Sequence, residues 1–77
     1  MDKQQPHDIL HGVTLETVLT RLFKKYGWEG LYSRIKINCF GIDPSIKSSL
    51  TFLRKTPWAR EKVEKLYINL KPEDRKD

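Results

Sequence analysis

Cysteine is nearly absent from this chain of 77 residues, since Cys39 is the only one. A lone cysteine cannot form a disulfide within its own chain, so nothing in the sequence favours an oxidising compartment. A catalytic cysteine would need a neighbouring base to hold its thiolate. The only two histidines lie near the N-terminus, and Ile37 and Phe40 beside Cys39 favour burial of the thiol. The sequence therefore predicts a buried cysteine without a catalytic role.

Motifs that carry catalysis or bind metals are also missing. The chain has no glycine-rich loop for phosphates, no paired-carboxylate pattern and no H-E-x-x-H motif. His7 and His11 lie four residues apart, as zinc ligands can, but Cys39 is the only other candidate ligand. We expect a protein that is not an enzyme and that uses no metal, cofactor or small-molecule substrate.

Long apolar runs are missing too. No run approaches the length that spans a membrane, and the N-terminal sequence MDKQQPHDIL lacks the apolar core of a signal peptide. Apolar residues make up 38% of the chain, which at this length is enough for a single small core. We expect a cytoplasmic protein without membrane contact, with association with the nucleoid as one option.

Acidic residues are missing from the centre of the chain. No Asp or Glu lies between Pro44 and Trp58, and residues 44–67 hold six basic residues against two acidic ones. The net charge of the whole chain is +5, so most of the excess lies in this central stretch. A basic excess of this kind favours an anionic partner.

What the chain does have is a strong helical period. Apolar residues recur three and four positions apart, which predicts an all-α fold of four helices near residues 15–26, 28–35, 44–55 and 57–69. Between the second and third helices, residues 36–42 alternate apolar and polar side chains and predict an extended connector. The expected core consists of Leu15, Val18, Leu19, Leu22, Leu31, Ile35, Ile46, Leu50, Leu53, Val63 and Leu66.

Local signals mark the ends of these helices. Thr14, Asp43 and Thr56 are the expected N-caps, and a proline follows both Asp43 and Thr56 at the first helical position. Gly27 is expected to end the first helix. Outside the helical domain of residues 14–70, we expect a loose arm over residues 1–13. We also expect a disordered tail over residues 71–77, which mix both signs of charge and contain Pro72.

The third helix and the start of the fourth carry the candidate site. Winding at about 100° per residue places basic and hydroxyl side chains of the third helix opposite its apolar face. At the junction RKTPWAR, residues 54–60, the N–H groups at the start of the fourth helix add an anion-friendly site. The candidate residues for contact with DNA are Lys47, Ser48, Thr51, Arg54, Lys55, Thr56, Trp58, Arg60 and Lys62.

Charge and pattern alone leave three interpretations open. The basic face can bind nucleic acid through its phosphates. It can equally dock an acidic protein partner. In the third interpretation the role is structural, because Arg54 and Lys55 also complement the negative end of their own helix and Thr56 is a good helix start in any protein.

One long run of residues narrows this choice. The run PSIKSSLTFLRKTPWAREKVEKLY, together with the earlier LHGVTLE, YGW and INCF, resembles a family of short bacterial DNA-binding proteins of the VF-five-thirty type, first catalogued as a domain of unknown function. The resemblance covers roughly residues 8–67. It implies a compact four-helix motif that binds double-stranded DNA, with some likeness to the DNA-binding C-terminal part of RecA, and it implies no enzyme activity. It assigns no residue to DNA contact, so the candidate residues rest on the charge argument.

Overall fold

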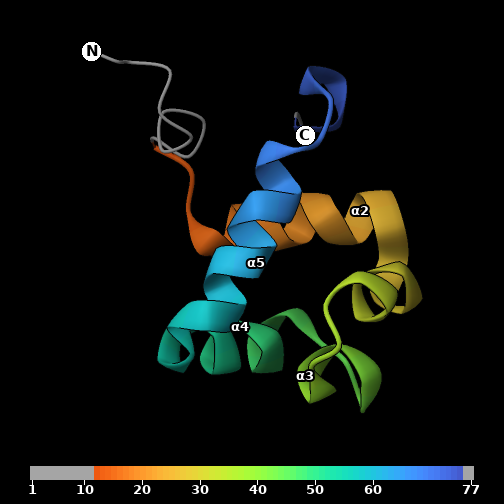
Figure 1. Ribbon diagram of the computed structural model, residues 1–77, viewed down its shortest axis with the longest axis vertical. Coiled ribbons are helices and arrows are strands. Elements are labelled where there is room, and N and C mark those ends of the chain that lie inside the picture. Colours follow the sequence, from red (N-terminus) through yellow and green to blue (C-terminus); the bar gives the residue numbers. More distant parts are fainter. Residues whose placement is uncertain (1–11, 76–77) are drawn as a thin grey trace.

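Most of the chain that the computed structural model describes, residues 12–75, is helical (Figure 1). The order of elements is α2 (Leu15–Arg34), α3 (Asn38–Gly41), α4 (Ile46–Lys55), α5 (Pro57–Ile68) and a final 3-10 turn, η1 (Pro72–Arg75). Within residues 12–75 no strand is present, which confirms the predicted all-α class. The expected loose arm falls largely on residues 1–11, which lie outside the described range.

The first two predicted helices are the two halves of α2. Thr14 caps the start as predicted, since its side-chain oxygen accepts a hydrogen bond of 3.1 Å from the Thr17 N–H. Gly27 breaks the helix where the sequence placed a stop, with φ 71° and ψ 174°. Backbone of this kind is open essentially to glycine alone. The break turns the second half of α2 away from the direction of the first.

The predicted extended connector is wrong over residues 38–41, which form the single helical turn α3. Ile37 and Phe40 are both buried, at 5% and 1% exposure. Side chains three residues apart share one face of a helix, so this pair follows the helical period and not the strand period that the alternation suggested. Ile35 and Ile37 before α3, and Ile42 after it, do keep extended backbone.

The start of α4 also differs from the prediction. Ser45, and not Asp43, is the N-cap, and its side-chain oxygen accepts a hydrogen bond of 3.1 Å from the Ser48 N–H. Asp43 has a positive φ of 45°, whereas an N-cap usually has extended backbone such as Ser45 adopts. The predicted start of α5 is confirmed in position, with Thr56 at the N-cap and Pro57 in the first turn, but the Thr56 side chain makes no capping hydrogen bond.

The core forms where the four α-helices of residues 15–68 meet. Eight of the predicted core residues are buried, namely Val18, Leu19, Leu22, Leu31, Ile35, Leu50, Leu53 and Val63, and the other three, Leu15, Ile46 and Leu66, are partly buried against them. Tyr67 and Leu70 join this cluster at 1% and 5% exposure. The buried Ser49 hydroxyl is satisfied, because Ser49 Oγ donates to the Cys39 carbonyl at 3.2 Å.

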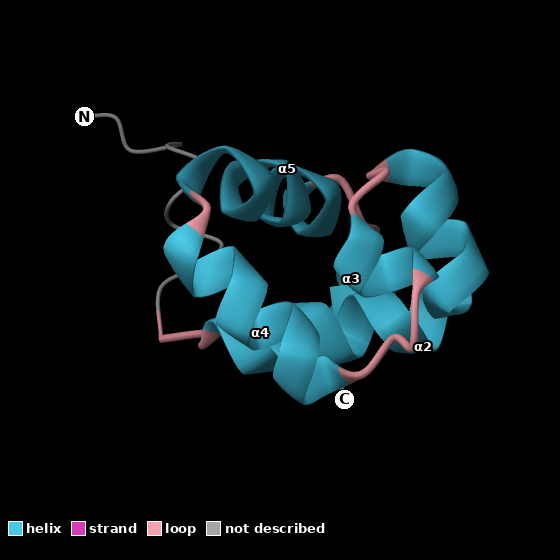
Figure 2. Cartoon of the chain, turned by 90° about the horizontal axis from the view of Figure 1, so that it is seen from below, coloured by secondary structure: helices cyan, strands magenta, loops and turns pink. Residues whose placement is uncertain are grey.

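Helix α2 is the element against which the others pack, since α3, α4, α5 and η1 all contact it. Helix α5 contacts both α2 and α4. Figure 2 shows α4 and α5 meeting at an angle through the short loop between them. This arrangement leaves the outer side of α4 and the α4–α5 junction at the surface.

The expectation of a disordered tail does not hold for Pro72–Arg75. The Arg75 guanidinium donates to the carbonyl of Ile68, the last residue of α5, at 3.2 Å and to the carbonyl of Leu70 just after the helix. Lys25 Nζ lies 3.1 Å from Asp74 Oδ2. These contacts hold η1 on α2 and α5, although the mixed charges of the sequence suggested a solvated segment.

Candidate nucleic-acid interface

The outer side of α4 carries a basic arc, which we define as Lys47, Ser48, Thr51, Arg54 and Lys55. All five residues are exposed, whereas Leu50 and Leu53 on the opposite side are buried. The periodicity of the sequence therefore placed this face correctly. Three cations on one helix, with no acidic residue in α4, give a surface that attracts a polyanion.

The two hydroxyls of the basic arc already have acceptors. Ser48 Oγ lies 3.4 Å from the Ser45 carbonyl, and Thr51 Oγ1 donates to the Lys47 carbonyl at 3.1 Å. A phosphate would have to compete with these carbonyls for the hydroxyl protons. The lysine and arginine side chains are therefore the stronger donors of the arc.

Helix α5 begins directly after α4 ends, at Thr56. This residue is at once the C-cap of α4 and the N-cap of α5, and its side chain makes no capping hydrogen bond. The first N–H groups of α5 that find a backbone partner are those of Ala59 and Arg60, which bond to the Thr56 carbonyl. An anion near Thr56 and Trp58 meets the positive end of the helix dipole together with the charges of the last turn of α4.

Trp58 is 55% exposed, beside the start of α5. The other tryptophan of the chain, Trp28, packs partly buried against Phe23 and Phe40, with ring centroids 4.7 and 5.9 Å apart. Trp58 is thus the more exposed of the two tryptophans.

The structure does not place Arg60 and Lys62 on one face. Residues two apart on an α-helix project roughly 200° apart around its axis. Arg60 lies near Glu64, with Nε and Oε2 3.9 Å apart. Lys62 lies on the other side of α5, so the candidate residues divide between two sides of that helix.

Lys62 lines a hollow that the sequence did not indicate. The hollow has a volume of about 220 Å³ and lies between the end of α2 and the middle of α5. Its lining consists of Arg34, Ile35, Lys62, Lys65, Leu66 and Asn69. We call it the basic hollow, because three of these six residues are cations and none is acidic. The spacing of Lys62 and Lys65 was visible in the sequence, but the approach of Arg34 depends on the packing of α2 against α5.

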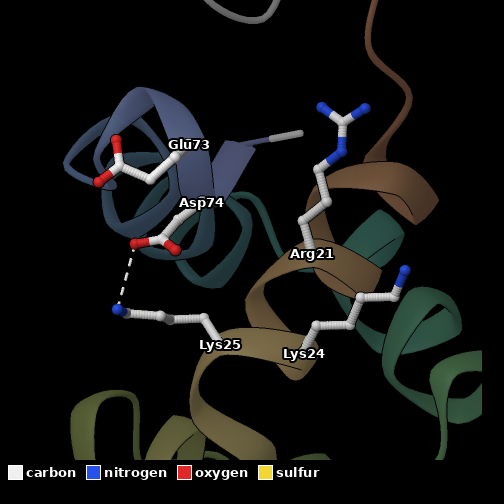
Figure 3. Close-up of a pocket in the computed structure, with 5 residues that line it drawn as sticks. All are labelled: Arg21, Lys24, Lys25, Glu73 and Asp74. Atoms are coloured by element: carbon white, nitrogen blue, oxygen red, sulfur yellow. Dashed lines mark ion pairs between the residues drawn. The ribbon is translucent and has the colours of Figure 1, made fainter. Parts of the chain in front are cut away.

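A second hollow, of about 230 Å³, lies under η1 and has a different character (Figure 3). Arg21, Lys24 and Lys25 line it together with Glu73 and Asp74. In Figure 3 the side chain of Lys25 reaches toward Asp74, while that of Lys24 points away from both carboxylates. The two acidic groups oppose an anion here, so this hollow is the weaker candidate for a phosphate.

Neither a reactive thiol nor a metal centre is apparent in residues 12–75. Cys39 is partly buried and not fully buried as predicted; this burial raises the pKa of its thiol above the ordinary value, while a hydrogen bond involving Ser49 works against the shift. Among the described residues no group of three or more His, Cys, Asp or Glu side chains could hold a metal ion. His7 and His11 lie outside the described range. No helix within residues 12–75 has the length and apolar character needed to cross a membrane.

The family model for the DNA-binding protein VF530 matches residues 6–68 of the chain. The chain belongs to this family. The match confirms the resemblance that the run at residues 44–67 suggested. No curated protein matches the chain.

Membership of the VF530 family supports nucleic acid as the partner. The matched region contains α2, α3, α4 and α5, and with them the basic arc and the three cations of the basic hollow. The turn η1, with Glu73 and Asp74, lies beyond it. The family match therefore covers the candidate cations but not the acidic groups of the second hollow.

Proposed function

We propose that this chain is a non-catalytic cytoplasmic protein that binds double-stranded DNA, mainly through phosphate contacts from the basic arc and the α4–α5 junction. The observation that supports it best is the outer side of α4, where exposed Lys47, Arg54 and Lys55 stand without an acidic neighbour in the helix. The family name supports DNA as the source of the phosphates.

Phosphate contact predicts how binding responds to salt and to sequence. Each phosphate that a cation neutralises releases counterions, so the logarithm of the affinity falls with the logarithm of the salt concentration. Contacts to the phosphates carry no base information. Unrelated duplexes should therefore bind with similar affinity, and this affinity should fall steeply as salt is raised.

The test compares Arg54→Ala and Lys55→Ala with the unchanged protein, by fluorescence anisotropy of two unrelated duplexes at several salt concentrations. Each substitution should weaken binding to both duplexes by a similar factor and lower the salt slope by about one unit. Lys24→Ala and Lys36→Ala are the matched controls, since both residues are exposed and lie outside α4 and α5. Lys25 is a poorer control because it is paired with Asp74.

Three outcomes would contradict the proposal. Tight binding to one duplex only, insensitive to salt, would show that base contacts dominate. Equal losses in the control variants would show that net charge, and not the α4–α5 face, determines affinity. Failure of the unchanged protein to bind any duplex would instead favour an acidic protein as the partner of this face.

A further inference from the structure

We propose that the basic hollow between α2 and α5 is a binding site for a single phosphate group, held by Arg34, Lys62 and Lys65. The inference that this phosphate belongs to a DNA backbone rests on the proposed function; the inference that the hollow binds phosphate does not. Arg34 comes from a different helix than the two lysines.

Arg34 is held in place by two contacts within α2. Its guanidinium carbon lies 4.0 Å from the centroid of the Tyr26 ring. One of its terminal nitrogens, Nη1, donates to the Gly30 carbonyl at 3.1 Å. An arginine that stacks on a ring and bonds a carbonyl loses less freedom when it binds a ligand. The remaining N–H groups of the fork are available to an anion.

The break at Gly27 makes this contact possible. Residues 26 and 34 would lie about 12 Å apart along the axis of an unbroken helix. The backbone of Gly27, with φ 71°, turns the second half of α2 and lets the Arg34 fork reach the Tyr26 ring. The missing side chain of Gly30 leaves room for Tyr26, because a Cβ atom at position 30 would lie only 2.8 Å from Tyr26 Cβ.

The lysines of α5 complete the site. Lys62 and Lys65 are three residues apart and so lie on one side of the helix, and both are exposed. Asn69, one turn further along, adds an amide group to the lining. With no carboxylate among the lining residues, nothing there neutralises the three cations. Such a group of forked and point donors matches the oxygens of one phosphate.

The basic hollow lies near the α4–α5 junction, because helix α5 carries residues of both. Trp58 precedes Lys62 by four residues and therefore lies one turn away on the same side of the helix. A backbone that contacts the α4–α5 junction can thus continue along this side of α5 to Lys62, Lys65 and Arg34. Arg60 lies on the opposite side and takes no part in this path.

The first arm of the experiment uses inorganic phosphate and the unchanged protein. In NMR spectra the Arg34 side-chain N–H signal and the backbone signals of residues 62–69 should shift and saturate as phosphate is added. Potassium chloride at equal ionic strength is the control and should give no saturating shift. In Lys62→Ala and Lys65→Ala the phosphate response should be lost, while the same response persists in Lys24→Ala. Absence of a saturating shift in the unchanged protein would overturn the site.

The second arm uses a duplex and decides where the phosphate comes from. Lys62→Ala and Lys65→Ala should each lower the salt slope of duplex binding by about 0.9. At 0.1 M salt this corresponds to an affinity about eightfold weaker. Lys24→Ala, with the same change of charge, should weaken it less than twofold. Arg34→Lys keeps the charge but removes the fork, so a loss in this variant shows that geometry and not net charge is responsible.

The two arms separate the possible failures. If phosphate saturates the hollow but the three variants bind duplex as tightly as Lys24→Ala does, the link to DNA is overturned and a free phosphate compound is the ligand. If the unchanged protein binds no duplex at all, the proposed function fails, and the phosphate titration alone decides whether the hollow is a site.

Discussion

Arg21 Nη1 donates a hydrogen bond of 2.6 Å to the hydroxyl of Tyr67, across 46 positions of the chain. The same hydroxyl lies 3.4 Å from the Arg75 carbonyl, and the Tyr67 side chain is only 1% exposed. One buried phenol therefore connects the first half of α2, the end of α5 and the turn η1. Its removal gives a direct measure of what holds the C-terminal turn in place.

Tyr67→Phe should lower the free energy of unfolding by about 1.5–3 kcal/mol, because the lost hydrogen bond involves a charged donor in a partly buried place. Urea unfolding followed by circular dichroism measures the change. Tyr32→Phe is the matched control: Tyr32 is 41% exposed, and its change should stay within about 0.5 kcal/mol. Equal effects in the two variants would show that the Tyr67 hydroxyl contributes no special stability.

Leu50→Ala should lower the free energy of unfolding by about 2–5 kcal/mol, since Leu50 is 7% exposed and its removal leaves a cavity under α4. Thermal melting checks this. Thr51→Ala, one residue along on the exposed side, should change stability by no more than about 0.5 kcal/mol. An unchanged melting temperature in Leu50→Ala would mean that α4 does not bury this face.

Gly27→Ala should cost about 1–3 kcal/mol of stability although a Cβ atom at this position would meet no other atom within 4 Å. The cost comes from the backbone, whose φ of 71° and ψ of 174° suit glycine alone. Gly27→Asn should give no rescue, because asparagine tolerates the left-handed helical region but not this one. Chemical unfolding of both variants provides the measurement, and a stable Gly27→Ala would show that α2 can straighten at no cost.

The Cys39 thiol gives a prediction about pH. Burial raises its pKa in the folded protein above that in the unfolded chain, so the folded state keeps the thiol proton to higher pH. The resulting stability is fully present below the pKa of the unfolded thiol, about 8.5, and is lost as the pH rises through the folded value. Unfolding curves from pH 7 to pH 10 should show the unchanged protein losing stability relative to Cys39→Ala. Parallel curves would mean that the thiol titrates alike in both states.

Much of the fold was predictable because its signals are local. The exposed side of α4 follows from the spacing of Leu50 and Leu53, and the start of α5 follows from Thr56 and the proline after it. The start of α4 was missed because Asp43 and Ser45 are both good caps by residue type. Only the backbone, with a positive φ at Asp43, distinguishes them. The turn α3 was missed because Ile35, Ile37 and Cys39 alternate with polar residues as in a strand, and the one pair at helical spacing, Ile37 and Phe40, is a weaker signal in so short a segment.

The candidate site was predictable where it lies on one helix and not where two helices meet. All five residues of the basic arc come from α4, so a helical wheel is sufficient to group them. The basic hollow joins Arg34 to Lys62 across 28 positions of sequence, and the tertiary packing of α2 on α5 brings them together. A helical wheel of α5 likewise places Arg60 and Lys62 on different sides of that helix, although the two basic residues are close together in the sequence.

The small turn η1 also has an electrical consequence. It lies toward one end of the longest axis of the molecule, with Glu73 and Asp74, while α4 and its cations lie toward the other (Figure 1). At the η1 end these carboxylates lie beside Arg21, Lys24 and Lys25, whereas α4 has no acidic residue to offset its cations. If the proposed function holds, the attraction of a duplex at a distance therefore favours encounters with α4 leading. Added salt screens this long-range attraction, so salt should slow association before it affects the lifetime of the complex.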